Sequence, residues 1–113
     1  MAEKIVRLED IIKLAQAGNR IEGEVNLARI TATCKVHPEA EIVEEKEAYF
    51  LKAMFRFKLA DQVYRVEKVY VMGFSDEDLD TTRLNKNIAN SRLKEDFRRL
   101  KEAGVILEER YFE

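Results

Sequence analysis

The chain of 113 residues is poor in the residues that build covalent or metal-stapled folds, with one cysteine, one histidine and one proline. A disulfide needs two cysteines and a zinc site needs three or four ligands, so Cys34 and His37 predict neither an intrachain disulfide nor a metal centre. The longest apolar runs are far shorter than the roughly 18 residues of a membrane span. The N-terminal segment MAEKIVRLED carries charges where a signal peptide is apolar. We therefore expect a cytoplasmic protein with no membrane span, no metal and no cofactor.

What the chain does contain is typical of one folded domain covering residues 1–113. Hydrophobic residues make up 46% and charged residues 37% of the sequence, a balance that favours a packed core over disorder. The net charge of −2 argues against a protein that coats nucleic acid. The charge is nevertheless uneven, because basic residues concentrate between Arg83 and Lys101 and acidic ones in HPEAEIVEEKE and SDEDLD.

The first third of the chain predicts a short helix and a long strand. Apolar residues at helical spacing indicate a helix over residues 8–17, ended by Gly18. From residue 20 the period is two, but the apolar parity reverses near Leu27-Ala28, which predicts one strand to residue 36 with a bulge at that point. Pro38 and the glutamates that follow predict the end of the strand and a solvated connection over 39–47.

Two alternating segments on either side of Ala60-Asp61 predict a hairpin with a two-residue turn. In that register, paired residue numbers sum to 121. One face then reads as a core face, with the pairs Phe57/Tyr64, Phe55/Val66, Leu51/Tyr70 and Tyr49/Met72. The other face mixes bases with apolar groups, through the pairs Lys58/Val63, Arg56/Arg65, Met54/Glu67, Lys52/Val69 and Phe50/Val71.

The last third predicts a long helix followed by a short extended segment. Ser75 and Asp78 have capping spacing, Gly104 is a helix stop, and residues 105–113 have the composition of a final strand or tail. The expected fold is α+β: a single-layer antiparallel sheet of three to four strands, with two helices packed on one face, in the order α-β-β-β-α-β.

The long helix carries a polar stripe that is a candidate binding site. At 100° per residue, six side chains with N–H donors fall within about 80° of one another: Arg83, Asn87, Asn90, Lys94, Arg98 and Lys101. Such a row is suited to successive phosphates, but it is equally typical of a solvated helix face. Arg92, Glu95, Arg99 and Glu102 form a further stripe, with the spacing of mutual ion pairs.

Two apolar residues of the same helix do not fit its core stripe. Leu84 and Ile88 lie almost opposite Leu93 and Phe97, so one straight helix cannot bury all four against one sheet. Either the helix breaks near Asn90, or Leu84 and Ile88 contact another element or a partner subunit.

The mixed face of the hairpin is a candidate interface. Phe50, Met54, Val69 and Val71 lie on it among lysines and arginines. It is interpreted as an exposed sheet back, as a dimer or partner interface, or as a nucleic-acid surface on which aromatic groups stack and cations meet phosphates. Lys68, opposite Ala53 on the core face, is either a residue that extends to solvent at the margin or a buried base.

Three functional hypotheses follow from these patterns. The favoured one is a small non-catalytic binding or protein-interaction domain that forms a homodimer or binds a protein partner. The second is an RNA- or nucleotide-binding module that uses the basic stripe. The third is an enzyme, for which only Lys68 and His37 are candidates.

Overall fold

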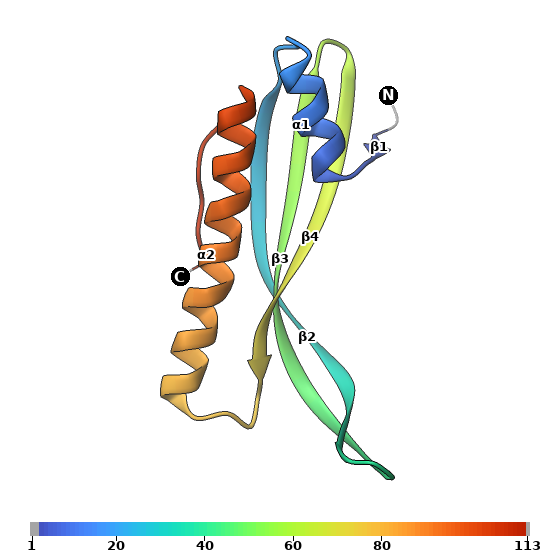
Figure 1. The fold of residues 1–113 in the computed structure, drawn as a ribbon, viewed down its shortest axis with the longest axis vertical. Helices are drawn as coiled ribbons and strands as arrows, with labels where there is room; N and C mark the ends of the chain where they lie inside the picture. The colour runs from blue at the N-terminus through green and yellow to red at the C-terminus, as the bar shows by residue number, and fades with distance from the viewer. Residues whose placement is uncertain (1–2, 113) are drawn as a thin grey trace.

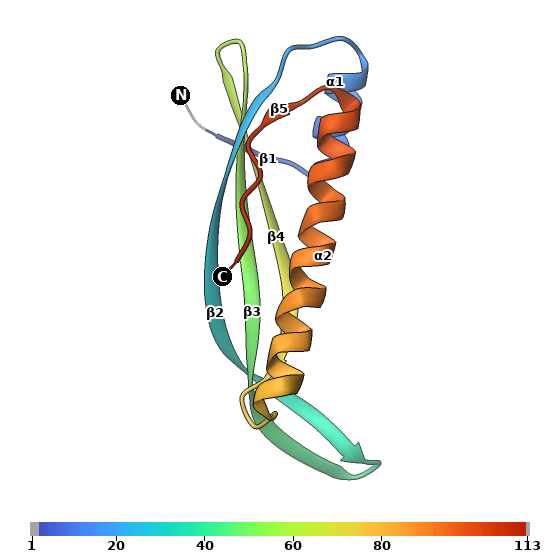
Figure 2. The ribbon, with the colours of Figure 1, turned by 90° about the vertical axis from the view of Figure 1, so that its left-hand side faces the viewer.

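The computed structural model describes residues 3–112, which form a twisted five-stranded sheet and two helices (Figure 1). The elements are β1 (Lys4–Ile5), α1 (Leu8–Gln16), β2 (Glu22–Glu39), β3 (Ile42–Leu59), β4 (Gln62–Phe74), α2 (Leu79–Ala103) and β5 (Ile106–Leu107). The strand order is β1-β4-β3-β2-β5. The α+β class is confirmed, with both helices on one face of the sheet (Figure 2).

The predicted antiparallel sheet of three to four strands is wrong in count and in direction. Only the β2–β3–β4 meander is antiparallel, whereas β1 pairs parallel with β4 and β5 pairs parallel with β2. Strands β1 and β5 have two residues each, so they show no alternation that a sequence pattern could reveal. Only their neighbours in the folded sheet make them strands.

The β3–β4 hairpin has the predicted register from the turn to Phe50. Its paired numbers sum to 121 from Leu59/Gln62 to Phe50/Val71, and Ala60 takes a left-handed φ of 51° in the turn. The predicted Tyr49/Met72 pair is wrong, because a bulge shifts the register and Tyr49 lies opposite Gly73. After the bulge, each β4 residue therefore pairs with a β3 residue one position closer to the turn than predicted.

Strand β2 differs from the prediction in two places. Its pairing with β3 is unbroken from Glu22 to Val36, so the predicted bulge near Leu27-Ala28 is wrong. On the helix side of this strand Val25 is buried and Leu27 half-buried, but Arg29 is exposed. The reversal in apolar parity therefore marks the position at which the helix side of β2 ceases to be part of the core.

The β2–β3 hairpin continues past the rest of the sheet as a two-stranded arm, residues 33–47 (Figure 1). The predicted strand end at His37-Pro38 is wrong, since β2 reaches Glu39 and pairs again at Glu39/Ile42 after a register shift. Proline is tolerated there because the shift removes it from the regular ladder. The predicted solvated connection over 39–47 is the turn and second strand of the arm.

The core lies between the sheet and the two helices. Helix α2 contributes the predicted core stripe of Leu93 and Phe97, and Ala89 and Leu100 on the same side are also fully buried. Phe55 stacks on Phe57 with ring centroids 5.7 Å apart, and it meets Phe97 edge-on at 5.9 Å. Asp78 caps the helix by accepting a hydrogen bond from the Thr81 N–H at 2.7 Å, and Gly104 ends it with φ 104°. Ser75, the predicted start of the cap, precedes it in a turn.

Candidate interaction surfaces

The helix-free face of the sheet carries an apolar band across three strands. One row of this band contains Ile30, Phe50 and Val71, which are cross-strand neighbours on β2, β3 and β4. Val71 and Val69 are each 53% exposed and Ile30 is 36% exposed. Phe50 and Met54 are half-buried. These valines and Phe50 belong to the predicted interface, and Ile30 is a member that the hairpin register alone did not include.

Charged residues around this band are paired with one another. Lys52 lies 3.9 Å and Arg65 lies 2.6 Å from the Glu67 carboxylate, and the Lys46 ammonium lies 3.0 Å from Asp76. Lys46 also lies 5.7 Å from the Phe74 ring centroid. Pairing of these cations weakens the case for a polyanion surface here, because each is already opposed by a carboxylate.

The basic stripe of α2 is partly covered by the end of the chain itself. Residues 108–112, here called the C-terminal strap, run back along the helix from β5 (Figures 1 and 2). Asn90 donates to the Phe112 carbonyl at 2.8 Å and accepts from the Phe112 N–H at 3.0 Å. Lys101 forms an ion pair with Glu109 at 2.9 Å, and Tyr111 meets Phe97 edge-on at 5.6 Å. Three contacts of different kinds thus hold the strap on the helix.

The remaining members of the stripe do not form one continuous site. Arg98 pairs with Glu95 and with Glu102, the latter at 2.7 Å, so it belongs to an ion-pair cluster. The predicted pairing of Glu95 and Glu102 with Arg92 and Arg99 is therefore wrong, because both carboxylates pair with Arg98. Arg99 pairs with Asp96 and Glu9 instead. Within residues 3–112, Arg83, Asn87 and Lys94 have no ion pair or side-chain hydrogen bond. Half of the six predicted residues are thus held by groups of the chain itself.

Helix α2 is continuous through Asn90, so the predicted break is wrong. The asparagines instead hold neighbouring segments: Asn90 holds the strap, and Asn85 donates to Glu77 at 2.7 Å. That second bond passes over Gly73, where an added Cβ would lie 2.5 Å from the Asn85 amide nitrogen. Amide side chains are suited to this role because they donate and accept at once.

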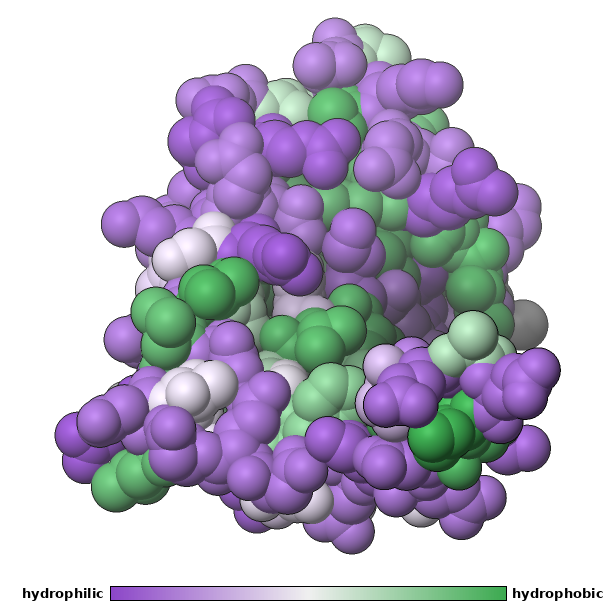
Figure 3. All heavy atoms as spheres, turned by 60° about the horizontal axis from the view of Figure 1, so that its bottom comes forward, coloured by the Kyte–Doolittle hydropathy of each residue, from purple (hydrophilic) through white to green (hydrophobic). Residues whose placement is uncertain are grey.

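Leu84 and Ile88 remain exposed, at 59% and 41%, and helical spacing places them about 180° around α2 from the buried Leu93 and Phe97. They lie near the arm end of the molecule, where apolar groups reach the surface among hydrophilic ones (Figure 3). The apolar band and this leucine–isoleucine pair point in opposite directions, so a single flat interface cannot include both. The predicted interface therefore divides into two separate surfaces.

A charge cluster that the sequence analysis missed lies where β4 meets α2. The Tyr70 hydroxyl donates to the buried Asp96 carboxylate at 2.5 Å. Lys68 and Arg99 lie 3.7 and 3.5 Å from the same carboxylate, and Arg99 also reaches Glu9 of α1 at 3.6 Å. Burial, and then the bond to Asp96, raises the pKa of Tyr70. Lys68 thus has a counter-ion and extends to the margin of the core, where its side chain is 35% exposed.

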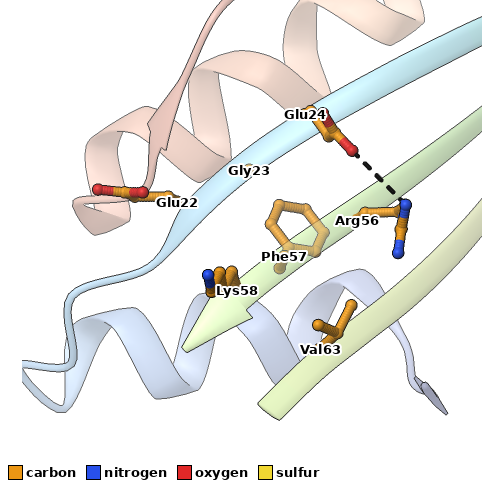
Figure 4. Close-up of a pocket in the computed structure, with 7 residues that line it drawn as sticks. All are labelled: Glu22, Gly23, Glu24, Arg56, Phe57, Lys58 and Val63. Carbon is orange, nitrogen blue, oxygen red and sulfur yellow. Dashed lines mark ion pairs between the residues drawn. The ribbon is translucent and has the colours of Figure 1, made fainter. Parts of the chain in front are cut away.

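A hollow of about 460 Å³ opens beside the upper part of β2 and β3 (Figure 4). Charged side chains form its rim, including Glu24 and Arg56, whose charged groups are 3.9 Å apart. Phe57 lies against Gly23, where an added Cβ would come within 2.8 Å of the ring. Gly23 therefore leaves room for the aromatic ring of the neighbouring strand.

The other candidate residues from the sequence, His37 and Cys34, do not form a site with neighbouring residues of the described chain. His37 is exposed and Cys34 is partly exposed on the arm. Among residues 3–112, no three or more His, Cys, Asp or Glu side chains are grouped so that they could hold a metal ion. No helix in that range is long and apolar enough to cross a membrane.

Comparison with protein-family models, with curated proteins and with solved structures finds no match to this chain.

Proposed function

We propose that this chain is a non-catalytic protein-interaction domain that works as a homodimer, joined through the helix-free face of the sheet. The observation that carries the proposal is the apolar band centred on Ile30, Phe50 and Val71, which no element among residues 3–112 covers. Exposed apolar patches of this kind are typical of association surfaces. Two sheets can pack face to face about 10 Å apart with their inner side chains interleaved.

A second copy of the chain is the occupant that best suits this band. In a two-fold contact each surface meets itself, so any unpaired charge at the centre would face a like charge. The lysine and arginine residues beside the band are opposed by Glu67 and Asp76 within the same chain, which lowers that repulsion. An apolar centre with a charge-paired rim is the usual anatomy of a protein–protein interface.

Light scattering tests the proposal directly. The wild-type chain of 13.2 kDa is expected to have the mass of a dimer, and Val71→Asp the mass of a monomer, because a carboxylate would be buried in the apolar interface. Val43→Asp is the matched control, since Val43 is also 53% exposed but lies on the arm, away from the band. A monomeric wild type at high concentration contradicts the proposal. So does dissociation by Val43→Asp alone.

Nucleic-acid binding by the basic stripe has less support, because the C-terminal strap already engages Asn90 and Lys101. Arg83 and Lys94 are the cations left for this role. A salt-sensitive shift of labelled RNA that is lost in Lys94→Glu would favour this alternative over the first.

A further inference from the structure

Strand β2 has an open edge along most of its length. It pairs with β3 from Glu22 to Glu39, but on its other side β5 pairs only at Glu22 and Gly23. The other margin of the sheet, β4, pairs with β1 at Tyr64 and Arg65 and packs against α2. A row of unpaired N–H and C=O groups on a regular strand is a template for a further strand.

The backbone groups that point outward can be assigned from β5. Ile106 donates its N–H to the Ile21 carbonyl at 2.9 Å, so Ile21 directs its backbone groups toward the free side. Successive residues of a strand alternate, and the pairing with β3 has no irregularity before Val36. The odd-numbered residues therefore direct their N–H and C=O groups away from β3: Val25, Leu27, Arg29, Thr31, Thr33 and Lys35.

Features that usually prevent an edge strand from pairing, such as a bulge, a proline or a covering segment, lie only at the two ends of β2. The register shift and Pro38 lie beyond Val36, β5 lies before Glu24, and Glu108 and Arg110 of the C-terminal strap lie beside Val25 and Asn26. Between them runs a regular stretch about twice as long as an average strand, with exposed alanines on the helix-free side and exposed threonines on the helix side. The middle of β2 is therefore an edge at which no bulge or proline opposes pairing.

Arg29 gives this edge a charge preference. Its guanidinium lies 5.2 Å from the centroid of the Tyr49 ring, and it has no ion pair among residues 3–112. Lys35, on the same face, lies opposite Glu45 of β3 and is partly compensated. The charge left over at the centre of the edge is therefore positive, and a carboxylate on an added strand beside Arg29 would be favoured.

A second copy of the chain does not meet this preference. Two β2 edges related by a two-fold axis would align odd-numbered residues with odd-numbered residues, and none of those between Val25 and Lys35 is acidic. Pairing centred on Ile30 would also place the two Arg29 side chains diagonally across the junction. The occupant is therefore a strand of different sequence.

We propose that the open edge of β2 between Leu27 and Lys35 binds an extended segment of another protein, which adds a strand to the sheet. The segment carries an acidic residue beside Arg29 on the helix side and apolar residues on the helix-free side. These apolar residues prolong the row of Ile30, Phe50 and Val71 by one strand. Main-chain hydrogen bonds supply affinity and the Arg29 contact fixes the register. The main-chain groups of this edge are not part of the homodimer band, and binding at the edge does not require the dimer.

Fluorescence polarisation with synthetic peptides tests the proposal. The probe is the fluorescein-labelled peptide Thr-Val-Thr-Val-Glu-Val-Thr-Val-Thr, and its control replaces the central Glu by Lys. We expect the wild-type chain to bind the Glu peptide about fivefold or more tightly than the Lys peptide. Arg29→Glu, an exposed position whose fold can be checked by circular dichroism, should reverse this order. A preference that does not reverse overturns the assignment of Arg29.

N-methylated peptides separate strand addition from adsorption. One isomer carries N-methyl groups on Glu and on all the threonines except the N-terminal one, the other on the four valines, so each has four N-methyl groups and their composition is matched. Only one of these sets faces β2, so one isomer should lose binding and the other should keep it. Loss with the Glu and Thr set indicates antiparallel addition, and loss with the Val set indicates parallel addition. Equal binding of both isomers overturns the proposal.

A last variant tests whether a second copy occupies the edge instead. Asn26 would lie opposite Cys34 of another copy in pairing centred on Ile30, so Asn26→Cys would allow disulfide-linked dimers to form. Efficient cross-linking there overturns the assignment to a different protein. The homodimer is tested independently, because Val71→Asp should leave peptide affinity unchanged. A monomeric chain that binds the Glu peptide refutes the homodimer alone, and a dimer that binds no peptide refutes the edge alone.

Discussion

The two faces of the sheet are built from the same three long strands, yet only one of them is a core. On the helix side Leu51, Phe55 and Val66 are almost completely buried under α1 and α2. On the helix-free side Val69 and Val71 are each 53% exposed. Apolar side chains in strands therefore indicate which faces can be buried, and the position of the helices decides which one is buried within the chain.

The largest expected effect of a single change lies on the helix side. Phe97→Ala should lower the free energy of unfolding by about 3–5 kcal/mol, because it removes a fully buried ring that contacts Phe55 and Tyr111. Val69→Ala on the other face should change it by less than about 0.5 kcal/mol. Urea unfolding in the Val71→Asp background measures both without a contribution from association. Similar losses for the two variants would contradict the division into a core face and an interaction face.

A smaller effect is expected from the polar cluster behind the core face. Tyr70→Phe should cost about 2 kcal/mol, because it removes a buried hydrogen bond to a carboxylate. The pKa of Tyr70 is raised in the folded protein, so the native state holds this proton more strongly than the unfolded chain does. The stability that the Tyr70 hydroxyl contributes is complete below the unfolded pKa of about 10, and it is lost as the pH rises above that value.

Thermal unfolding between pH 8 and 11 checks that sign. The wild type should lose stability above about pH 10 more steeply than Tyr70→Phe. Tyr111→Phe should flatten the profile in the same sense, because partial burial and the bond to Glu109 raise the pKa of Tyr111 to about 12. Parallel pH profiles for the wild type and Tyr70→Phe would show that the Asp96 cluster does not hold the tyrosine proton.

The smallest expected effect is a gain at the turn that joins β3 and β4. Ala60 has a φ of 51°, a left-handed conformation that favours glycine. Ala60→Gly should raise the free energy of unfolding by about 0.5–1 kcal/mol, because the relief of left-handed strain exceeds the added chain entropy. Neither face of the sheet should change, so the mass in light scattering should equal that of the wild type. Destabilisation would mean that the turn is not strained.

Local patterns were enough to predict the parts of the fold that depend on neighbouring residues. The β3–β4 register followed from alternation and the position of one turn, and it holds as far as Phe50/Val71. The core stripe of α2 followed from helical spacing. Both predictions succeed because a side chain's direction is fixed by the period of its own element.

The outcome at the candidate surfaces depended on long-range contacts. Asn90 and Lys101 read as donors for a ligand, but the strap, which begins only after the helix has ended, engages both. Asp96 gave no signal in the sequence, because its partners Tyr70 and Lys68 lie on another element. The parity reversal in β2 was read as a bulge, although the change is in which face is covered.

The sequence by itself determined the α+β class, the central hairpin and the buried stripe of the long helix, because these follow from local periodicity. Only the tertiary structure decided that α2 runs unbroken and that β1 and β5 join the sheet. It also decided which groups remain without a partner, since burial and pairing are relations between segments far apart in the chain. The open edge of β2 is an example. Its residues alternate like those of any strand, and its outward backbone groups are unpaired because β5 has only two residues.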